Sequence, residues 1–333
     1  MAVSELGSIA EIEGWEAPVH KPLPIRLALG LKNFARKKPL GFVCGVVVIF
    51  FFVIGDVVPE TTNKVSRTIG LSDHPVPYLA DQLEQMVPWL YPYAKQDLRA
   101  RLEGASNAHL LGTDAIGRDI LSRLMYGART AVMVSFGAVL ISMSMGAFIG
   151  IMSGFYGGWV DKVLYRIVDV FQALPPLVIL IVILGIFDSG LWQLVIVLGV
   201  IGGPIQSRTL RGQTIYVMAS PFIEAARVIG CSDRRIMMRY ILPNVFALIV
   251  LNATFSLGFL VLLEATLSFL GYGLPPPFPS WGQMLSLEGR QYMRTQPGLA
   301  IYPGLAIGML VFSFNLFGDA LRDVLDPRLR GSR

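Results

Sequence analysis

The sequence predicts an all-α integral membrane protein with six transmembrane helices, and three observations carry this prediction. Of its 333 residues, 53% are hydrophobic and only 15% are charged. Its mean hydropathy of +0.58 lies far above that of an ordinary soluble domain. Several apolar stretches with few charges reach the roughly 20 residues that a helix needs to cross a hydrocarbon core about 30 Å thick.

The six predicted spans leave polar segments before, between and after them, and the fourth span is short and rich in glycine. The spans are residues 40–58, 130–154, 164–187, 191–205, 245–263 and 297–317. They divide the chain into a cytoplasmic N-terminal segment, a first helix, an extracytoplasmic loop or cap, a helical core and a cytoplasmic tail. The corresponding residues are 1–39, 40–58, 59–129, 130–320 with a cytoplasmic loop at 206–243, and 321–333.

Basic residues predict the orientation of these spans. Residues 1–39 begin with acidic side chains and do not resemble a signal peptide, because the apolar run starts too late and is too long. Five basic residues stand before the first span: Arg26, Lys32, Arg36, Lys37 and Lys38. Positive charge beside a span favours the cytoplasmic side, so both termini are expected in the cytoplasm. The net charge of +5 is therefore attributed to topology and not to nucleic-acid binding.

The long segment 59–129 is predicted to form a folded extracytoplasmic cap. Its first half, residues 59–108, is rich in proline and aromatic residues, and a short amphipathic helix is expected at 79–87. A connection of this length without secondary structure would be unusual in a folded domain. Further along, Trp281 follows a proline-rich loop and is expected to anchor it at the membrane interface.

Two of the spans carry faces of small residues at helical spacing. The second span has Ala138, Ser142, Gly146, Gly150 and Gly154, and the sixth has Ala300, Gly304 and Gly308. Such faces let two backbones approach closely. Packing within one subunit is favoured for both over a subunit interface.

Polar residues also occur at membrane depth, and they must avoid lipid. They are Gln172, Asn252, Thr254, Ser256, Ser313 and Asn315. They face either neighbouring helices or a water-filled path, and hydrogen bonding between helices is favoured for any single one. Arg166 and Asp169 lie three residues apart, which favours a local structural ion pair.

The residue types that carry catalysis or bind metals lack the spacing that either function needs. Only two cysteines, Cys44 and Cys231, and three histidines occur, and none has metal-ligand spacing. Phosphate-binding loops and the common hydrolase motifs are absent. We therefore expect no catalytic residue, no metal and no cofactor, and any ATP hydrolysis is assigned to another chain.

The stretch from Ser220 to Asn244 predicts a compact helical knob in the fourth inter-span loop. Ser220 can cap a first helix, Pro221 suits its first position, and Gly230 can end it in the left-handed conformation. That helix would be roughly 13 Å long. Ser232 or Asp233 can cap a second helix that runs to Pro243. Taken alone, this pattern fits a plain connector equally well.

The knob also carries a motif, because Glu224-Ala-Ala is followed by Gly230 and then by Leu242-Pro243. This resembles the coupling segment of ABC importer permeases, which docks into a cleft on the ATPase subunit. The resemblance implies ATPase-coupling roles for Glu224, Ala225, Ala226, Gly230, Leu242 and Pro243. Tyr240 departs from the general pattern, which prefers isoleucine there.

Three further segments resemble the second permease of dipeptide and oligopeptide importers, in the peptide/nickel family. They are residues 109–129, 264–282 and 318–331. The resemblance implies a type I ABC importer permease fold in the bacterial inner membrane. It also implies a homologous second permease, one or two ATPase subunits and an extracytoplasmic binding protein. Peptide is the expected substrate, and the same subfamily also moves nickel chelates and oligosaccharides.

Acidic and basic residues alternate in the first of these segments. Asp114 with Arg118, and Asp119 with Arg123, have the spacing of helical ion pairs. A capped helix start explains them, and an extracytoplasmic gate or docking surface at Asp114, Arg118 and Asp119 is the functional alternative. A secondary transporter would need ion-coupling residues and repeat symmetry, and a membrane enzyme would need a catalytic constellation. Neither pattern is evident.

Overall fold

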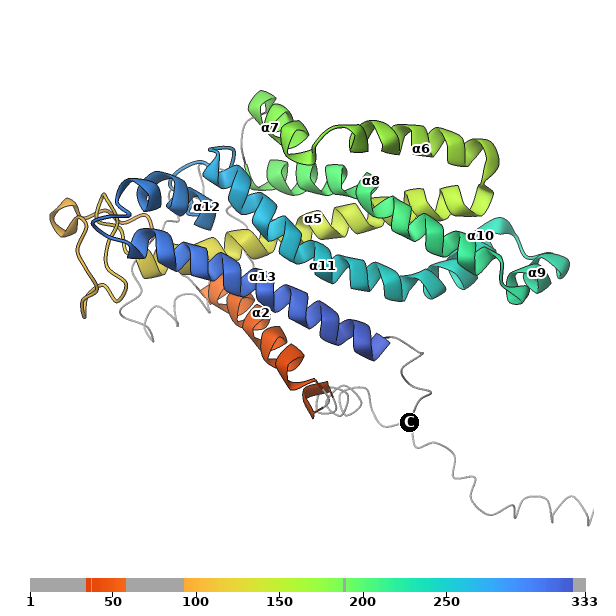
Figure 1. The fold of residues 1–333 in the computed structure, drawn as a ribbon, viewed down its shortest axis with the longest axis horizontal. Coiled ribbons are helices and arrows are strands. Elements are labelled where there is room, and N and C mark those ends of the chain that lie inside the picture. Colours follow the sequence, from red (N-terminus) through yellow and green to blue (C-terminus); the bar gives the residue numbers. More distant parts are fainter. Residues whose placement is uncertain (1–33, 37, 58–92, 188–189, 326–333) are drawn as a thin grey trace, which may run out of the picture.

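The computed structural model describes residues 34–36, 38–57, 93–187 and 190–325, and the regular structure in these residues is helical. The expected helix at 79–87, residues 59–92 of the expected cap and most of the N-terminal segment lie outside the described residues. The long helices are α2 (Pro39–Val57), α5 (Ile120–Tyr156), α6 (Gly158–Ala173), α7 (Pro176–Ile186), α8 (Leu191–Met218), α11 (Leu242–Phe269) and α13 (Gly298–Leu325). They run roughly side by side, except α7, which is bent away from α6 (Figure 1).

Short elements lie at the two ends of this bundle. At one end, on the right in Figure 1, lie α9 (Pro221–Val228), α10 (Asp233–Ile236) and the π-helical turn η2 (Met237–Ile241). We call this the knob end. At the other end lie the 3-10 turn η1 (Leu98–Ala100), α12 (Trp281–Met284) and the π-helical turn η3 (Leu285–Gly289). We call this the loop end.

Four helical stretches of the described residues are long and apolar enough to cross a membrane: Ile120–Tyr156, Leu191–Met218, Asp233–Phe269 and Gly298–Val324. α6 and α7 together are also long and apolar enough, but they are bent by 85° at the break between them. They count as a fifth crossing only if the pair is one broken span. The expectation of one continuous helix at 164–187 was therefore wrong. Pro175 and Pro176 force the preceding backbone out of the helical region, and Leu174 is extended at φ −104° and ψ 143°.

Two helices extend beyond the spans predicted from hydropathy. α5 begins at Ile120 and is 37 residues long, about 55 Å, which exceeds the thickness of a hydrocarbon core. α8 has Pro204 in its interior and continues past residue 205 through Arg208 and Arg211 to Met218, so the loop expected at 206–243 begins only after residue 218. Hydropathy marks where apolar residues stop, whereas backbone hydrogen bonds continue the helix into a more polar environment.

The small-residue face of α5 packs against α8, as expected for contact within one subunit. A Cβ atom added at Gly146 would lie 2.8 Å from Gln206 Cβ, and one at Gly150 would lie 2.8 Å from the Ser207 carbonyl oxygen. The face of α13 differs, because a Cβ at Gly304 or Gly308 would meet no described atom within 4 Å. Within the described residues, these two glycines therefore pack against no neighbouring helix, so the expected contact within the subunit is not seen for them.

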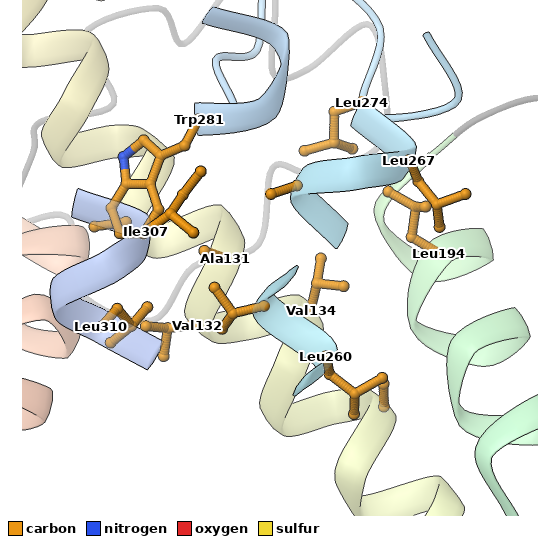
Figure 2. Packing of buried hydrophobic residues seen from close by; sticks show 14 of the residues in the cluster. Ala131, Val132, Val134, Leu194, Leu260, Leu267, Leu274, Trp281, Ile307 and Leu310 are labelled. Carbon is orange, nitrogen blue, oxygen red and sulfur yellow. The ribbon is translucent and has the colours of Figure 1, made fainter. Parts of the chain in front are cut away.

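The main hydrophobic core joins α5, α8, α11, α12 and α13 near the loop end, as Figure 2 shows. Trp281 is fully buried there, and its indole nitrogen donates a 2.8 Å hydrogen bond to the Leu124 carbonyl. Its ring also packs edge-on against the ring of Phe51, with the two ring centroids 5.7 Å apart. The expected interfacial anchor is thus a core residue, because Gly127 leaves room on α5 for the indole.

Charged residues near the knob end pair between helices and not along one helix. Asp169 of α6 binds Arg208 of α8 at 2.7 Å, so the expected pair with Arg166 is not formed. Asp161 of α6 accepts two hydrogen bonds from Arg211 of α8, at 2.7 and 2.6 Å. These contacts fix α6 against α8 beside the knob.

Candidate functional site

The knob begins with a sharp turn after α8. Ser220 occupies the N-cap position of α9 with an extended backbone, although its side chain makes no capping hydrogen bond. Pro221 follows in the first turn, where its missing N–H costs nothing. Glu224 lies in the same turn, with its carboxylate near the positive end of the helix dipole. α9 has 8 residues, about 12 Å, which is close to the predicted length.

Gly230 ends α9 in the left-handed conformation that the sequence predicts, with φ at +78°. The Gly230 amide donates to the Arg227 carbonyl, and the Cys231 amide donates to the Ala226 carbonyl, both at 3.0 Å. This pair of bonds is the Schellman arrangement of a helix C-terminus. The turn is therefore held by backbone geometry that only glycine adopts at little cost.

The second helix of the knob does not stop at Pro243, contrary to the prediction. α10, η2 and α11 form one helical run from Asp233 to Phe269. The π-helical turn absorbs the proline, because the Leu242 amide bonds five residues back to the Met237 carbonyl. The Asn244 side chain also donates to the Tyr240 carbonyl at 2.7 Å. The knob is thus directly continuous with a membrane span.

The motif residues divide into a buried base and an exposed tip. Ala226 is buried in a small hydrophobic cluster, and Leu242 is partly buried against that cluster. The other motif residues are exposed: Glu224, Ala225, Gly230 and Pro243. The other buried members of this cluster are Ile151, Phe155, Leu210, Val217, Ile223, Ile236, Ile241 and Val245. The motif does not include Phe222, Val228 and Ile229, whose side chains are also exposed on the knob, Val228 to 87% and Ile229 to 75%. They could have been found from the sequence, because apolar residues in a loop predicted to be cytoplasmic indicate a contact surface.

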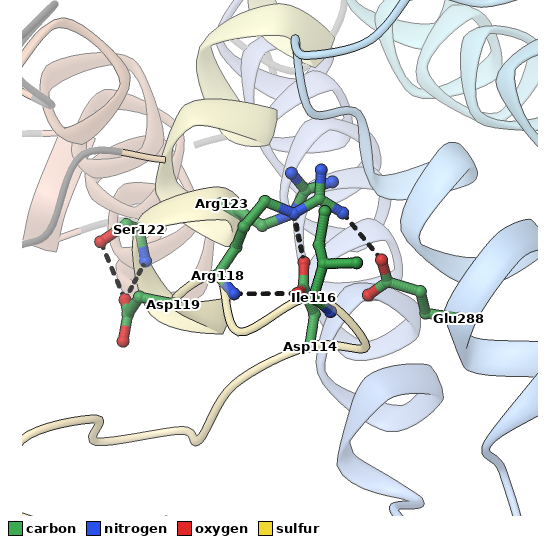
Figure 3. A network of polar contacts seen from close by, with 7 residues as sticks. All are labelled: Asp114, Ile116, Arg118, Asp119, Ser122, Arg123 and Glu288. Atoms are coloured by element: carbon green, nitrogen blue, oxygen red, sulfur yellow. Dashed lines mark hydrogen bonds and ion pairs between the residues drawn. The ribbon is translucent and has the colours of Figure 1, made fainter. Parts of the chain in front are cut away.

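Figure 3 shows the charged cluster at the loop end. Asp114 accepts a 2.5 Å bond from Arg118 Nε and also accepts from the backbone amides of Ile116 and Arg118. Arg118 Nη2 in turn binds Glu288 of η3 at 2.7 Å. This acid-base-acid chain joins residues that are far apart in the sequence, and Glu288 was not anticipated.

Asp119 caps α5, which confirms the predicted helix start. Its Oδ2 accepts from the Ser122 amide and from the Ser122 hydroxyl, both at 2.8 Å. The expected Asp119–Arg123 pair is not formed, because Asp119 faces the helix start while Arg123 Nε lies 3.5 Å from Asp114. Burial raises the pKa of the Glu288 carboxyl, Asp114 adds to this, and the charges of Arg123 and Arg118 oppose it.

Burial favours a structural role for this cluster over a docking surface. Asp114 and Asp119 are almost wholly buried, and Arg118 is nearly so. Arg101 also donates to the Tyr292 hydroxyl at 3.0 Å, and the Gln296 side chain donates to the Leu102 carbonyl. Together these bonds fasten residues 93–119 to the loop between α11 and α13. Among the described residues, no group of three or more acidic, histidine or cysteine side chains could hold a metal ion.

Comparison with known proteins places this arrangement in a family. Residues 146–331 match the family described as binding-protein-dependent transport system inner membrane component. This chain belongs to that family. The match covers α8, the whole knob, α11 and α13, so the motif, the exposed tip and the continuous helix lie within the family's common region.

Two curated relatives each match about three quarters of the chain. The glutathione transport system permease protein GsiD of Pectobacterium atrosepticum is 40% identical over 73% of this chain and 81% of its own length. The dipeptide transport system permease protein DppC of Alkalihalophilus pseudofirmus is 39% identical over 72% of this chain and 78% of its own length. Both are named as transport system permeases.

Solved structures support the same fold. An inward-facing structure of the MetNI methionine ABC transporter matches with a TM-score of 0.51 at 20% identity, over 62% of this chain and 98% of that chain. The fold is thus that of a type I ABC importer permease, as the sequence resemblance implied. The protein is a multi-pass permease subunit of an ABC importer in the bacterial inner membrane, and it is a non-catalytic membrane component.

Proposed function

We propose that this permease carries di- and oligopeptides, driven by separate ATPase subunits and supplied by an extracytoplasmic binding protein. Support for the substrate comes from relatives named for dipeptide and glutathione transport, which are both short peptides. A homologous second permease completes the path across the membrane. Nickel chelates and oligosaccharides are the alternative solutes.

The single observation that carries the coupling role is the exposed apolar tip of α9 on a buried base. Val228 and Ile229 are largely exposed at the end of the knob, where no lipid is expected to cover them. Glu224 and Gly230 flank this surface. The tip docks into the ATPase, and the helical run through η2 carries the movement of the ATPase into α11.

The test of this function is transport by a reconstituted complex. The permease, its partner permease and its ATPase subunits are purified together and placed in liposomes with the binding protein. We expect ATP-dependent uptake of a labelled dipeptide and no uptake of a nickel chelate or an oligosaccharide. Uptake of only one of these two alternatives would reject the peptide assignment, and uptake without ATP would reject the ATP-driven mechanism.

We also propose that both termini lie in the cytoplasm, which places the knob end inside the cell and the loop end outside. After Cys44 and Cys231 are replaced, single cysteines are introduced by Lys95→Cys and Arg330→Cys. A membrane-impermeant thiol reagent applied to intact cells is expected to label residue 95 and to spare residue 330. The reverse pattern would overturn the orientation.

A further inference from the structure

A small cavity lies among the spans near the break between α6 and α7, and its mostly apolar lining holds three polar side chains, those of Ser142, Gln206 and Ser256. Its volume is about 60 Å³, which is room for several waters. The lining comes from α5, α7, α8 and α11, and it includes Ser142, Pro176, Gly202, Gln206, Ser256 and Phe259. Gln206 stands about 22 Å along α8 from Leu191, and Ser256 about 20 Å from the end of α11, so both lie at membrane depth.

The polar groups of this cavity are uncharged. Gln206 Nε2 donates to the Ser256 hydroxyl at 2.8 Å and so joins α8 to α11. One turn from Ser256, the buried side-chain nitrogen of Asn252 has no hydrogen-bond partner within the described part of the chain. From α6, Gln172 donates to the Pro204 carbonyl at 3.1 Å. Amides and hydroxyls from three helices therefore gather at one level.

Irregular backbone lies at the same level. The last carbonyls of α6 have no helical partners beyond the break at Leu174, and Pro204 removes one hydrogen bond from α8. Backbone of this kind is tolerated at membrane depth only where it is buried in protein or lines a water-filled cavity. In transporters, broken helices commonly form the substrate site near the midplane. Gln206 and Ser256 are partly exposed. Because polar side chains at membrane depth avoid lipid, their exposed surface must face protein or water.

We propose that Gln206 and Ser256 form a hydrogen-bonding station on the substrate path, where they contact the backbone amides of a passing peptide. This inference rests on the proposed peptide substrate. Amide and hydroxyl groups can donate to and accept from peptide groups without selecting a side chain. The ion pair between Asp169 and Arg208 lies on the knob side of the cavity, so the station itself carries no fixed charge. Peptides of different side-chain charge therefore pass it equally.

Water access is tested first, because it does not depend on the substrate. In the assembled transporter, with Cys44 and Cys231 replaced, single cysteines are introduced by Ser256→Cys and Gln206→Cys. The controls are Leu140→Cys and Phe148→Cys, which replace large apolar side chains exposed on α5 at neighbouring depth. A cationic methanethiosulfonate reagent is expected to label the two station positions at least about tenfold faster, since a charged reagent is excluded from hydrocarbon. Equal labelling would overturn the proposal.

Contact with substrate is tested by uptake. Ser256→Ala and Gln206→Leu are each expected to lower dipeptide uptake by about three- to tenfold, in equal proportion for acidic, neutral and basic dipeptides. Membrane level and ATPase association are measured for both variants, and Ser256→Ala is the variant that changes the least volume. Normal uptake, or a loss confined to one charge class, would overturn the proposal. If the wild type moves no dipeptide while labelling stays fast, the peptide assignment fails and the water-filled path stands.

Discussion

Gly230→Val is expected to lower transport and substrate-stimulated ATP hydrolysis together, by about tenfold, while the permease remains inserted in the membrane. Gly230 has φ at +78°, and a β-branched residue in this conformation costs on the order of 1–2 kcal/mol. No described atom lies within 4 Å of the position of an added Cβ, so the effect comes from backbone strain and not from a clash. The strained turn would shift Val228 and Ile229, which form the proposed docking surface.

Glu224→Lys is expected to act in the same direction through charge. The carboxylate is exposed in the first turn of α9, where a negative charge is stabilising and a positive charge is not. Lysine also removes an acceptor for charge-assisted hydrogen bonds from the ATPase.

The matched control for both variants is Ser232→Ala. Ser232 is exposed in the same knob and makes no capping hydrogen bond with its side chain. Co-purification of the ATPase, dipeptide uptake and ATP hydrolysis are measured for all three proteins. If Gly230→Val and Glu224→Lys kept full transport and normal ATPase binding, the knob would be a plain connector with no coupling role.

Gly150→Leu is expected to destabilise the permease by about 1–3 kcal/mol, which is the usual cost of overpacking a tight contact. An added Cβ would lie 2.8 Å from the Ser207 carbonyl oxygen and 2.9 Å from the Arg211 amide nitrogen, and both are backbone atoms of α8. Backbone cannot move aside as a flexible side chain can, so α5 and α8 must separate. The Asp161–Arg211 bonds beside this contact would be lost with it.

The control for Gly150→Leu is the same substitution at Gly304, whose added Cβ would meet no described atom within 4 Å. Thermal unfolding of the purified subunit in detergent measures the effect. Gly150→Leu should lower Tm and the yield of folded protein, and Gly304→Leu should change neither. Equal Tm values for the two variants would show that close α5–α8 packing is not needed for stability.

Local patterns in the sequence determined the fold class and the shape of the knob. Apolar length predicted helical spans, because each span satisfies its own backbone hydrogen bonds. Pro221 and Gly230 predicted the two ends of α9, because their preferred dihedral angles depend little on distant residues. Asp119 predicted the start of α5 for a similar reason, since its side chain bonds to an amide three residues ahead.

Contacts between distant segments decided which side chains pair, which enter the core and which line the cavity. Asp169 pairs with Arg208, Arg118 with Glu288, and Trp281 enters the core, because helix packing brings these residues together from 39 or more positions away. The sequence named Gln172 and Ser256 as polar residues at membrane depth without relating them to Gln206. Only the packing of α8 against α11 near the broken α6–α7 pair places Gln206 and Ser256 in one cavity, since no local pattern records which helix faces which.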